Sequence, residues 1–545
     1  MNKSILAASI CAALTAGQSQ AATFNVTTNA DSGAGSLRQA LTDAGTNAEA
    51  DVIDLAAISG QTITLSSGAL YSGYDDIMID GADVTVDAGG NSRVIETYYA
   101  DVTLNDLTIT GGDSLDGEES RPGGGIYSKY GDLTLNNTTV TGNTAGAPGG
   151  GLAIAGYDSS VTINDSVISG NTGGADGGGL FVYTYYGNVS ISGSTISGNS
   201  AEGGGLQPPP PTSGPKNTGR DLTQRLAARL NDPERRPAAL RGEPGAYSQG
   251  GGGFVIVGYG DIEVTDSTIS GNQADAGAGL VAISAYGGVS VAGSTFSANQ
   301  ADQFGGAGAL QSKYTVSLLN STISGNSSGD LNGGFALYSS AAGPIRGDGT
   351  RGVPSPVTIE FTTVTGNTAV DIGGIGISSD LSATIVASVI AGNTATTDPD
   401  IGFQPGPTTT ADVSVSLIGV DTSSGTLTFD AASAALLGQD PLLGPLADNG
   451  GPTFTHLPGA GSPLIDAVAA GEFGCGTIFN IDQRGEPRPQ GAGCEIGALE
   501  NTAGVPPLPE ILPVPTLDRI GLWLMVGLLG FAGWFGVRRR ASRNV

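Results

Sequence analysis

The dipeptide Gly-Asn recurs along this chain at nearly constant spacing. Successive asparagines lie 28, 28, 73, 27, 27, 41 and 26 residues apart, and Ala-Asn replaces Gly-Asn at one of them. The two long steps correspond to one repeat plus insertions of roughly 45 and 14 residues, and a period of this length predicts a solenoid of stacked repeats. The recurring residues are Asn143, Asn171, Asn199, Asn272, Asn299, Asn326, Asn367 and Asn393.

Each repeat contains three short stretches typical of strands. In one repeat, Val161 and Ile163 alternate with polar residues, and Ile168 belongs to a second β-branched run. Leu180 and Val182 alternate again, and the repeat shows no helical periodicity. We therefore predict an all-β fold, a right-handed parallel β-helix of ten to twelve rungs, as in pectate-lyase-like solenoids.

The repeated Asn has a structural role in such a solenoid. An inward-facing amide can donate to and accept from the same residue one rung away, which gives a ladder of hydrogen bonds along the rod. The Gly-Gly-Gly runs that precede the third strands are expected to be turns, because they lead into strands and not into the helix that a phosphate-binding loop requires.

Tyrosines recur in step with the asparagines. They fall one to four residues before the first strand of the next repeat, so they should line up along one edge of the rod. Stacked rings can simply stabilise the solenoid. Alternatively, an exposed strip flanked by Asp132, Asp158 and Asp261 suits the apolar faces of sugar rings and would bind glycans. The column is Tyr130, Tyr157, Tyr186, Tyr259, Tyr286 and Tyr314.

The chain divides into segments of different composition. Residues 206–250 hold seven of the 22 basic residues and a run of four prolines, and we expect a disordered insertion with at most one short helix. A smaller insertion covers 341–356. The expected organisation is a signal peptide at 1–21, an N-terminal cap and first rungs at 22–100, β-helix repeats at 101–430, and a C-terminal region at 431–500. A Pro-rich linker at 501–512 and a tail at 513–545 with one transmembrane helix at 520–537 are expected to follow.

Charge and composition limit the possible partners. The 51 acidic against 22 basic residues give a net charge of −29, which argues against nucleic acid as a partner. We expect no cofactor, and the Cys and His residues form no zinc-binding pattern. An acidic loop could gather oxygen ligands for calcium, with a solvated loop as the alternative reading. Its residues are Asp113, Asp116, Glu118 and Glu119.

Catalytic residues stay unassigned. A lyase acting on polyuronates needs a base and several cations to neutralise the substrate carboxylate. Outside the two insertions, residues 103–403 offer only Arg121, Lys129 and Lys313, and the one histidine, His456, is expected to be structural. The Asn-Thr-Asp, Asp-Asp, Gly-His-Gly and Arg-Ile-Lys motifs of polygalacturonases are missing, although a pair of carboxylates could still serve a hydrolase. We therefore favour a role without catalysis.

Both chain ends indicate export. Lys3, the apolar run after it and the small residues before Ala22 are typical of a secretory signal peptide. The span 520–537 is followed by an Arg cluster, which predicts a cytoplasmic tail. Cys475 and Cys494 remain after signal removal, and in an oxidising compartment we expect them to form a disulfide, with two free thiols as the alternative.

Three segments resemble parts of bacterial surface proteins. The tail motif, with its span and Arg cluster, resembles IPTL-CTERM sorting signals, which implies the Sec export machinery, a sorting protease and a tail that is removed; a permanent anchor in the inner membrane is the alternative. Residues 24–41 resemble the start of polymorphic outer-membrane proteins, in which Leu-Arg-Gln-Ala forms a capping helix. Segments within 440–500 resemble the choice-of-anchor Q region. The tail motif is Pro513, Val514, Pro515, Thr516 and Leu517.

These observations favour an exported protein of the cell surface or outer membrane that acts in adhesion or envelope structure and contacts a glycan or another cell-surface ligand. A polysaccharide-binding or polysaccharide-degrading enzyme on the same fold is the alternative.

Overall fold

The computed structural model describes residues 21–45, 50–114, 122–201, 250–339, 357–379, 381–403, 410–422 and 426–501. Residues 1–500 form one compact unit, and 501–545 belong to a second. The signal peptide, the linker, the sorting motif and the span at 520–537 thus lie almost wholly outside the described residues. Among the helices that are described, none has the length and apolar content needed to cross a bilayer.

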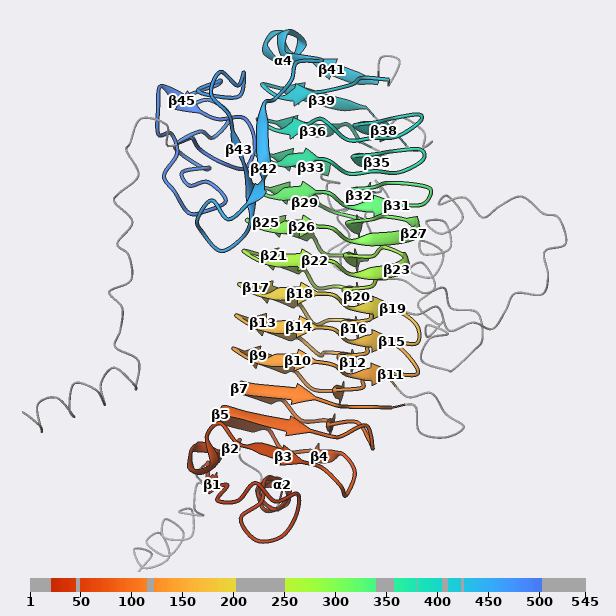
Figure 1. The fold of residues 1–545 in the computed structure, drawn as a ribbon, viewed down its shortest axis with the longest axis vertical. Coiled ribbons are helices and arrows are strands. Elements are labelled where there is room, and N and C mark those ends of the chain that lie inside the picture. The colour runs from red at the N-terminus through yellow and green to blue at the C-terminus, as the bar shows by residue number, and fades with distance from the viewer. Residues whose placement is uncertain are drawn as a thin grey trace, which may run out of the picture. The chain divides into compact units, whose positions relative to one another are not determined.

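The described part of the chain is a parallel β-helix (Figure 1). One coil consists of β13 (Val161–Asn164), β14 (Val167–Ser169), β15 (Thr172–Gly173) and β16 (Leu180–Thr184). The three strands expected from the sequence are present, and a fourth, β15, was missed because two residues are too few to show alternation. Equivalent strands of successive coils pair in parallel, for example Val161 with Val189.

Three sheets line the rod. Sheet A has 24 strands and combines the first two strands of each coil, because β5 and β7 each run through both positions; sheet B has eleven strands and sheet C six. Sheet A contains β1 (Thr23–Asn25), β2 (Asp51–Asp54), β3 (Thr62–Thr64), β5 (Ile77–Asp87), β7 (Val102–Thr110), β9 (Leu133–Asn136), β10 (Thr139–Thr141), β13, β14, β17 (Val189–Ser192), β18 (Thr195–Ser197), β21 (Ile262–Thr265), β22 (Thr268–Ser270), β25 (Val289–Ala292), β26 (Thr295–Ser297), β29 (Val316–Leu319), β30 (Thr322–Ser324), β33 (Val357–Glu360), β34 (Thr363–Thr365), β36 (Ala383–Val386), β37 (Val389–Ile390), β39 (Ala411–Ser414), β40 (Leu417–Ile418) and β41 (Leu427–Phe429).

The other two sheets follow the same stacking. Sheet B contains β4 (Leu70–Gly73), β6 (Ile95–Tyr98), β8 (Ile126–Lys129), β12 (Leu152–Ala155), β16, β20 (Gly253–Val257), β24 (Leu280–Ser284), β28 (Gly308–Ser312), β32 (Phe335–Ser339), β35 (Ile375–Ser379) and β38 (Ile401–Phe403). Sheet C contains β11 (Thr144–Ala145), β15, β19 (Ser200–Ala201), β23 (Gln273–Ala276), β27 (Gln300–Phe304) and β31 (Ser327–Ser328). The eleven strands of sheet B correspond to eleven coils.

The core is a continuous column of aliphatic side chains. Val161, Ile163 and Ile168 point inward from sheet A, and Leu180 and Val182 point inward from sheet B; all are fully or almost fully buried. Val161 and Ile163 alternate with polar residues, which is the pattern that a strand with one buried face requires. In β16, Phe181 between Leu180 and Val182 is also buried and belongs to a second apolar cluster. Because register is kept from coil to coil, each apolar position stacks on its equivalent, and a slip of one residue would turn the whole set outward.

Register survives both insertions. The chain leaves the coil after β19 and re-enters at Gly250 so that Val189 pairs with Ile262. Val316 likewise pairs with Val357 across the smaller insertion. Residues 202–249 and 340–356 lie outside the described residues, so the disorder expected for the long insertion stays a prediction.

A short helix closes the N-terminal end. The helix α2 (Leu37–Ala44) begins after Ser36, whose side chain accepts a hydrogen bond from the backbone of Gln39. Leu37 and Leu41 are buried against the first coil. This is the Leu-Arg-Gln-Ala segment expected to act as a cap. The 3₁₀ helix η1 (Ala56–Ile58) follows β2.

The C-terminal region lies alongside the rod. The helix α4 (Ala431–Leu436) follows the last strand of sheet A, and the chain then runs back beside earlier coils of that sheet (Figure 1). The region that contains His456 therefore covers a side of the rod. It contains two antiparallel pairs, β42 (Leu443–Ala447) with β43 (Thr455–Pro458), and β44 (Val468–Ala469) with β45 (Gly493–Cys494).

Candidate glycan-binding surface

A strip of tyrosines follows the turns between sheet B and the next strand of sheet A. Tyr157, Tyr186 and Tyr259 come two residues after β12, β16 and β20, so each of these successive coils adds a ring. Backbone hydrogen bonds hold these turns together, as between the Tyr186 N–H and the Tyr157 carbonyl at 2.8 Å. The strip is thus built by the repeat itself.

The rings form two runs of contacting pairs, which are stacked except for Tyr157 and Tyr186, whose rings meet edge to face. Tyr157 stacks instead on Tyr185, with the centroids 5.1 Å apart. Centroids are 5.3 and 4.8 Å apart in the first run and 5.1, 5.2 and 4.5 Å apart in the second. The first run is Tyr74, Tyr99 and Tyr130; the second is Tyr157, Tyr186, Tyr259 and Tyr286. Sequence reasoning missed Tyr74 and Tyr99, although each lies three residues before a strand of sheet A and could have been found by that spacing. Tyr314 is half-buried and joins no ring pair among the described residues.

Stacking leaves the strip open to solvent. The six tyrosines from Tyr74 to Tyr259 in these two runs are between 41% and 73% exposed, whereas Tyr286 is half-buried. Both interpretations of the column therefore have a basis: the rings pack on one another along the rod, and the residues remain exposed to solvent.

Hydrogen bonds between phenol groups raise the pKa of two tyrosines on this surface. A hydrogen bond to Tyr186 raises the pKa of Tyr157, and a hydrogen bond to Tyr259 raises the pKa of Tyr185. Neutral hydroxyls can both donate and accept, which suits the hydroxyls of a polyol ligand.

A row of side-chain oxygens runs beside the rings, two or three residues after each tyrosine. The Asp101 N–H donates to Asp76 Oδ1 at 2.9 Å, and the Asp132 N–H donates to Asp101 Oδ1 at 2.8 Å. Asp132 Oδ1 in turn accepts from the Ser160 N–H at 2.7 Å. Burial raises the pKa of Asp132, and the carboxylates of Asp101, Asp76 and Asp158 raise it further. The row continues from Asn188 Oδ1, which accepts from the Asp261 N–H, to Asp261 Oδ1, which accepts from the Gly288 N–H.

Two lysines lie on the strip. Lys129 Nζ is 4.8 Å from the centroid of Tyr130, and Lys313 Nζ is 4.8 Å from that of Tyr286. Lys129 is the last residue of β8 and Lys313 follows β28, five coils further on, which is about 24 Å at the usual spacing of paired strands. Arg121 lies outside the described residues. Lys129 and Lys313 therefore cannot converge on one carboxylate as a polyuronate lyase requires.

The asparagine ladder runs through the interior. Asn143 Nδ2 donates to Asn171 Oδ1 at 3.0 Å, Asn171 Nδ2 donates to Asn199 Oδ1 at 3.0 Å, and the pattern continues to Asn393. The backbone N–H of each residue donates to the same oxygen. The ladder ends on Asp400, whose Oδ1 accepts from Asn393. All eight amides are buried, and this role leaves none of them available to a ligand.

A second ladder was missed. Each asparagine is preceded by a buried hydroxyl five residues earlier, and the Ser166 N–H donates to Ser194 Oγ at 3.0 Å while the Ser194 N–H donates to Ser267 Oγ at 3.1 Å. The constant distance to Asn was a usable signal. The residues of this ladder are Thr138, Ser166, Ser194, Ser267, Ser294, Ser321, Thr362, Ser388, Ser416 and Ser433.

His456 has a structural position. Its Nδ1 donates to the Gly444 carbonyl at 2.7 Å, which leaves Nε2 of the neutral ring to accept from Ser324 Oγ at 2.8 Å. Burial lowers its pKa. Both ring nitrogens are thus used in holding the C-terminal region against β30.

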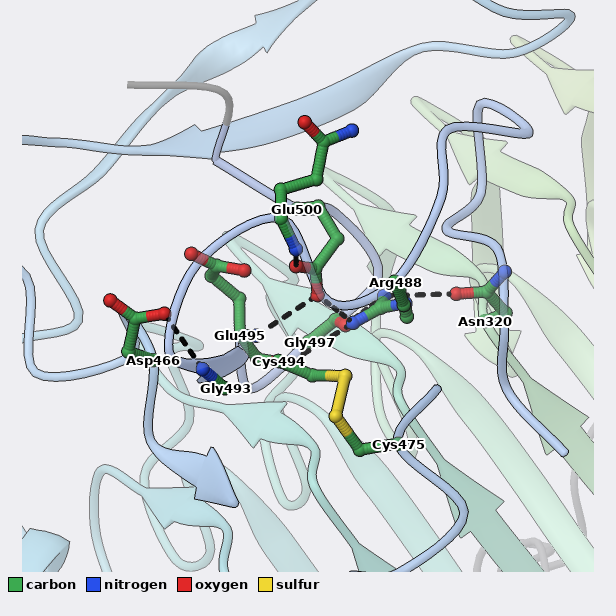
Figure 2. The surroundings of a disulfide bond; sticks show 10 residues. Asn320, Asp466, Cys475, Arg488, Gly493, Cys494, Glu495, Gly497 and Glu500 are labelled. Carbon is green, nitrogen blue, oxygen red and sulfur yellow. Dashed lines mark hydrogen bonds and ion pairs between the residues drawn. A yellow bond between two sulfur atoms is a disulfide. The ribbon is translucent and has the colours of Figure 1, made fainter. Parts of the chain in front are cut away.

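The two cysteines form a disulfide in the same region. The bond joins Cys475 to Cys494, with the Cα atoms 5.9 Å apart (Figure 2). Beside it, Arg488 Nη1 pairs with Glu500 Oε1 at 2.7 Å, and Arg488 Nη2 donates to Asn320 Oδ1 at 3.1 Å. The disulfide therefore lies within a network that ties the C-terminal region to the rod.

The described residues contain no group of three or more His, Cys, Asp or Glu side chains that could hold a metal ion. Of the acidic loop, Asp113 is described and forms a bridge with Thr144, whereas Asp116, Glu118 and Glu119 lie outside the described residues.

Comparison with solved structures finds a likeness to a pectate lyase. A solved structure described as "Crystal structure of pectate lyase Pel9A" aligns with a TM-score of 0.42 at 12% identity, over 89% of this chain and 98% of that one. No family model and no curated protein matches the sequence.

Proposed function

We propose that this chain is an exported β-helix protein of the cell surface or outer membrane that acts in adhesion or envelope structure by holding glycans on the tyrosine strip. The observation that carries the proposal is the run of stacked rings that stay largely exposed over several coils. Solvent-exposed aromatic rings offer apolar faces to the C–H faces of sugars, and the regular spacing suits an extended polymer more than a single small molecule.

Binding without turnover fits the charges on the rod. Lys129 and Lys313 are far apart, and His456 is committed to structural hydrogen bonds. The strip therefore offers ring faces and hydroxyls for binding, and lacks the converging base and cations of a polyuronate lyase within the described residues.

Location is proposed from the sequence at both ends. The signal peptide directs the chain to the Sec machinery, and the tail with its span at 520–537 places it in the inner membrane until a sorting protease removes the tail, or permanently if the tail is kept. The disulfide between Cys475 and Cys494 is compatible with an oxidising compartment.

The test replaces three exposed rings at once. The variant Tyr157→Ser, Tyr186→Ser, Tyr259→Ser should lose adherence to cells or insoluble glycans while the rod stays folded. Its melting temperature should fall, because six ring pairs are removed at about 1 kcal/mol or less for each. A matched control removes three exposed aromatic rings elsewhere, at Tyr71, Phe454 and Phe473, and should still adhere.

Two outcomes would reject the proposal. Adherence that survives the strip variant despite lower stability would make the rings a packing device only. Release of new reducing ends from soluble glycans by the purified protein would instead favour a polysaccharide-degrading enzyme.

A further inference from the structure

The row of oxygens beside the strip carries more charge than its structural task needs. Each member accepts a backbone N–H from the next coil, and Ser160 and Asn188 do this with neutral side chains. The Asn188 amide holds the Asp261 N–H at 2.9 Å, the same distance at which Asp76 holds the Asp101 N–H. Hydrogen bonding alone therefore does not explain carboxylates in this row.

Stacked carboxylates also repel one another. Asp76, Asp101 and Asp132 occupy equivalent positions in successive coils, and like charges facing each other across paired strands are destabilising. The raised pKa of Asp132 reflects burial first and then these neighbours. A cationic ligand lying along the row would relieve that repulsion.

The rings show which kind of cation they accept. The ammonium groups of Lys129 and Lys313 each lie 4.8 Å from a ring centroid of the strip, within the range of a cation–π interaction. One such contact is in the first run, at Tyr130, and the other is at the end of the second, at Tyr286. Primary ammonium groups thus fit ring faces in both runs of the strip.

We infer that the strip takes a polysaccharide whose sugar rings carry free amino groups, and that polyuronates are excluded. Sugar faces would lie on the tyrosines, and the ammonium groups would contact the ring faces and the carboxylate row. This inference rests on the proposed function, because it assumes that the strip binds glycan. A bound metal ion is a poorer explanation, since the carboxylates form a line and the described residues contain no converging group of three.

The experiment uses one polymer in two chemical forms. Insoluble poly-N-acetylglucosamine and the same material after chemical deacetylation differ only in their amino groups, and polygalacturonate serves as the anionic comparison. The full chain should bind the deacetylated form about tenfold more tightly, because several exposed charge contacts of a few-fold each are added. Added salt should reduce that preference.

The variant Asp76→Asn, Asp101→Asn, Asp132→Asn keeps the accepting Oδ1 atoms, as Asn188 does, and removes three charges. It should lose the preference for the deacetylated form while its melting temperature stays level or rises. A matched control removes three exposed charges away from the strip, at Asp302, Asp330 and Asp448, and should keep the preference.

The outcomes separate this inference from the proposed function. Equal binding of both polymer forms, if abolished by the tyrosine variant, would overturn the amino-sugar inference and leave glycan binding intact. Equal loss in the two aspartate variants would also overturn it, because net charge alone would then explain the preference. No binding to any polymer would reject the proposed function itself.

Discussion

Removing one amide from the interior ladder should destabilise several coils at once. The side chain of Asn171 takes part in four hydrogen bonds: its Oδ1 accepts from the N–H and the Nδ2 of Asn143, and its Nδ2 donates to the Val140 carbonyl and to Asn199 Oδ1. Asn171→Ala deletes all four and leaves buried donors and acceptors without these partners. At about 0.5 to 1.5 kcal/mol for each bond, the loss is about 2 to 6 kcal/mol.

Asn164 gives a matched control in the same coil. Its Nδ2 donates to Asn136 Oδ1 at 3.0 Å on the half-buried outer corner of sheet A. Asn164→Ala removes the same atoms from the chain but breaks one described side-chain hydrogen bond, which water can replace. We expect a loss of about 1 kcal/mol or less.

Urea unfolding followed by circular dichroism gives the free energies of unfolding of both variants. Hydrogen exchange shows which backbone amides lose protection. A solenoid contacts itself only through neighbouring coils, so the first sign should be faster exchange at the amide of Asn143, whose acceptor is lost. A loss of stability for Asn171→Ala no larger than that for Asn164→Ala would refute the reasoning. The buried hydrogen bonds of Asn171 would then stabilise the rod no more than the half-buried bond of Asn164.

Three further predictions concern other parts of the chain. Deleting residues 206–250 should change the melting temperature in calorimetry by only a few degrees, because closure entropy varies slowly with loop length; a collapse would mean that the segment packs. Replacing Cys475 and Cys494 by Ala should cost about 3 kcal/mol for a loop of this length, and intact protein should resist alkylation until it is reduced. Burial lowers the pKa of His456, so the unfolded chain takes up the proton first and stability should fall as pH drops below about 6.5; His456→Gln should remove that part of the pH dependence in urea titrations, and an unchanged slope would contradict it.

Periodic features could be predicted from the sequence because each coil repeats the same physical requirements. A strand such as β13 needs alternation for one buried face, and the turn after β14 needs Gly170 with positive φ before Asn171. Each requirement occurs once per coil. A sequence pattern that is weak in one repeat therefore becomes clear when it recurs along the chain. The hydroxyl ladder obeys the same rule and was missed only because Ser and Thr are common throughout the chain.

The packing of the C-terminal region has no such repetition. Gln483 Nε2 donates to Thr295 Oγ1 at 2.8 Å although 188 residues separate them, and Gln483 Oε1 accepts from Thr322 Oγ1 at 2.6 Å. Each contact is made once, between residue types that are polar and unremarkable in sequence. The sequence showed that residues after the repeats differ in kind, but no pattern in them could tell a cap on the end from a cover on the side.

The exposed tyrosines and the C-terminal region lie on different coils of the rod. The described hydrogen bonds from residues 453–498 to the repeats reach coils from Gly293 onward, as that from Thr453 Oγ1 to the Gly293 carbonyl, whereas the strongly exposed rings end at Tyr259. Distant sites without shared partners have nearly additive effects on stability. Substitutions in the strip should therefore leave the network around His456 intact, and loss of adherence in the tyrosine variant can be assigned to the rings themselves.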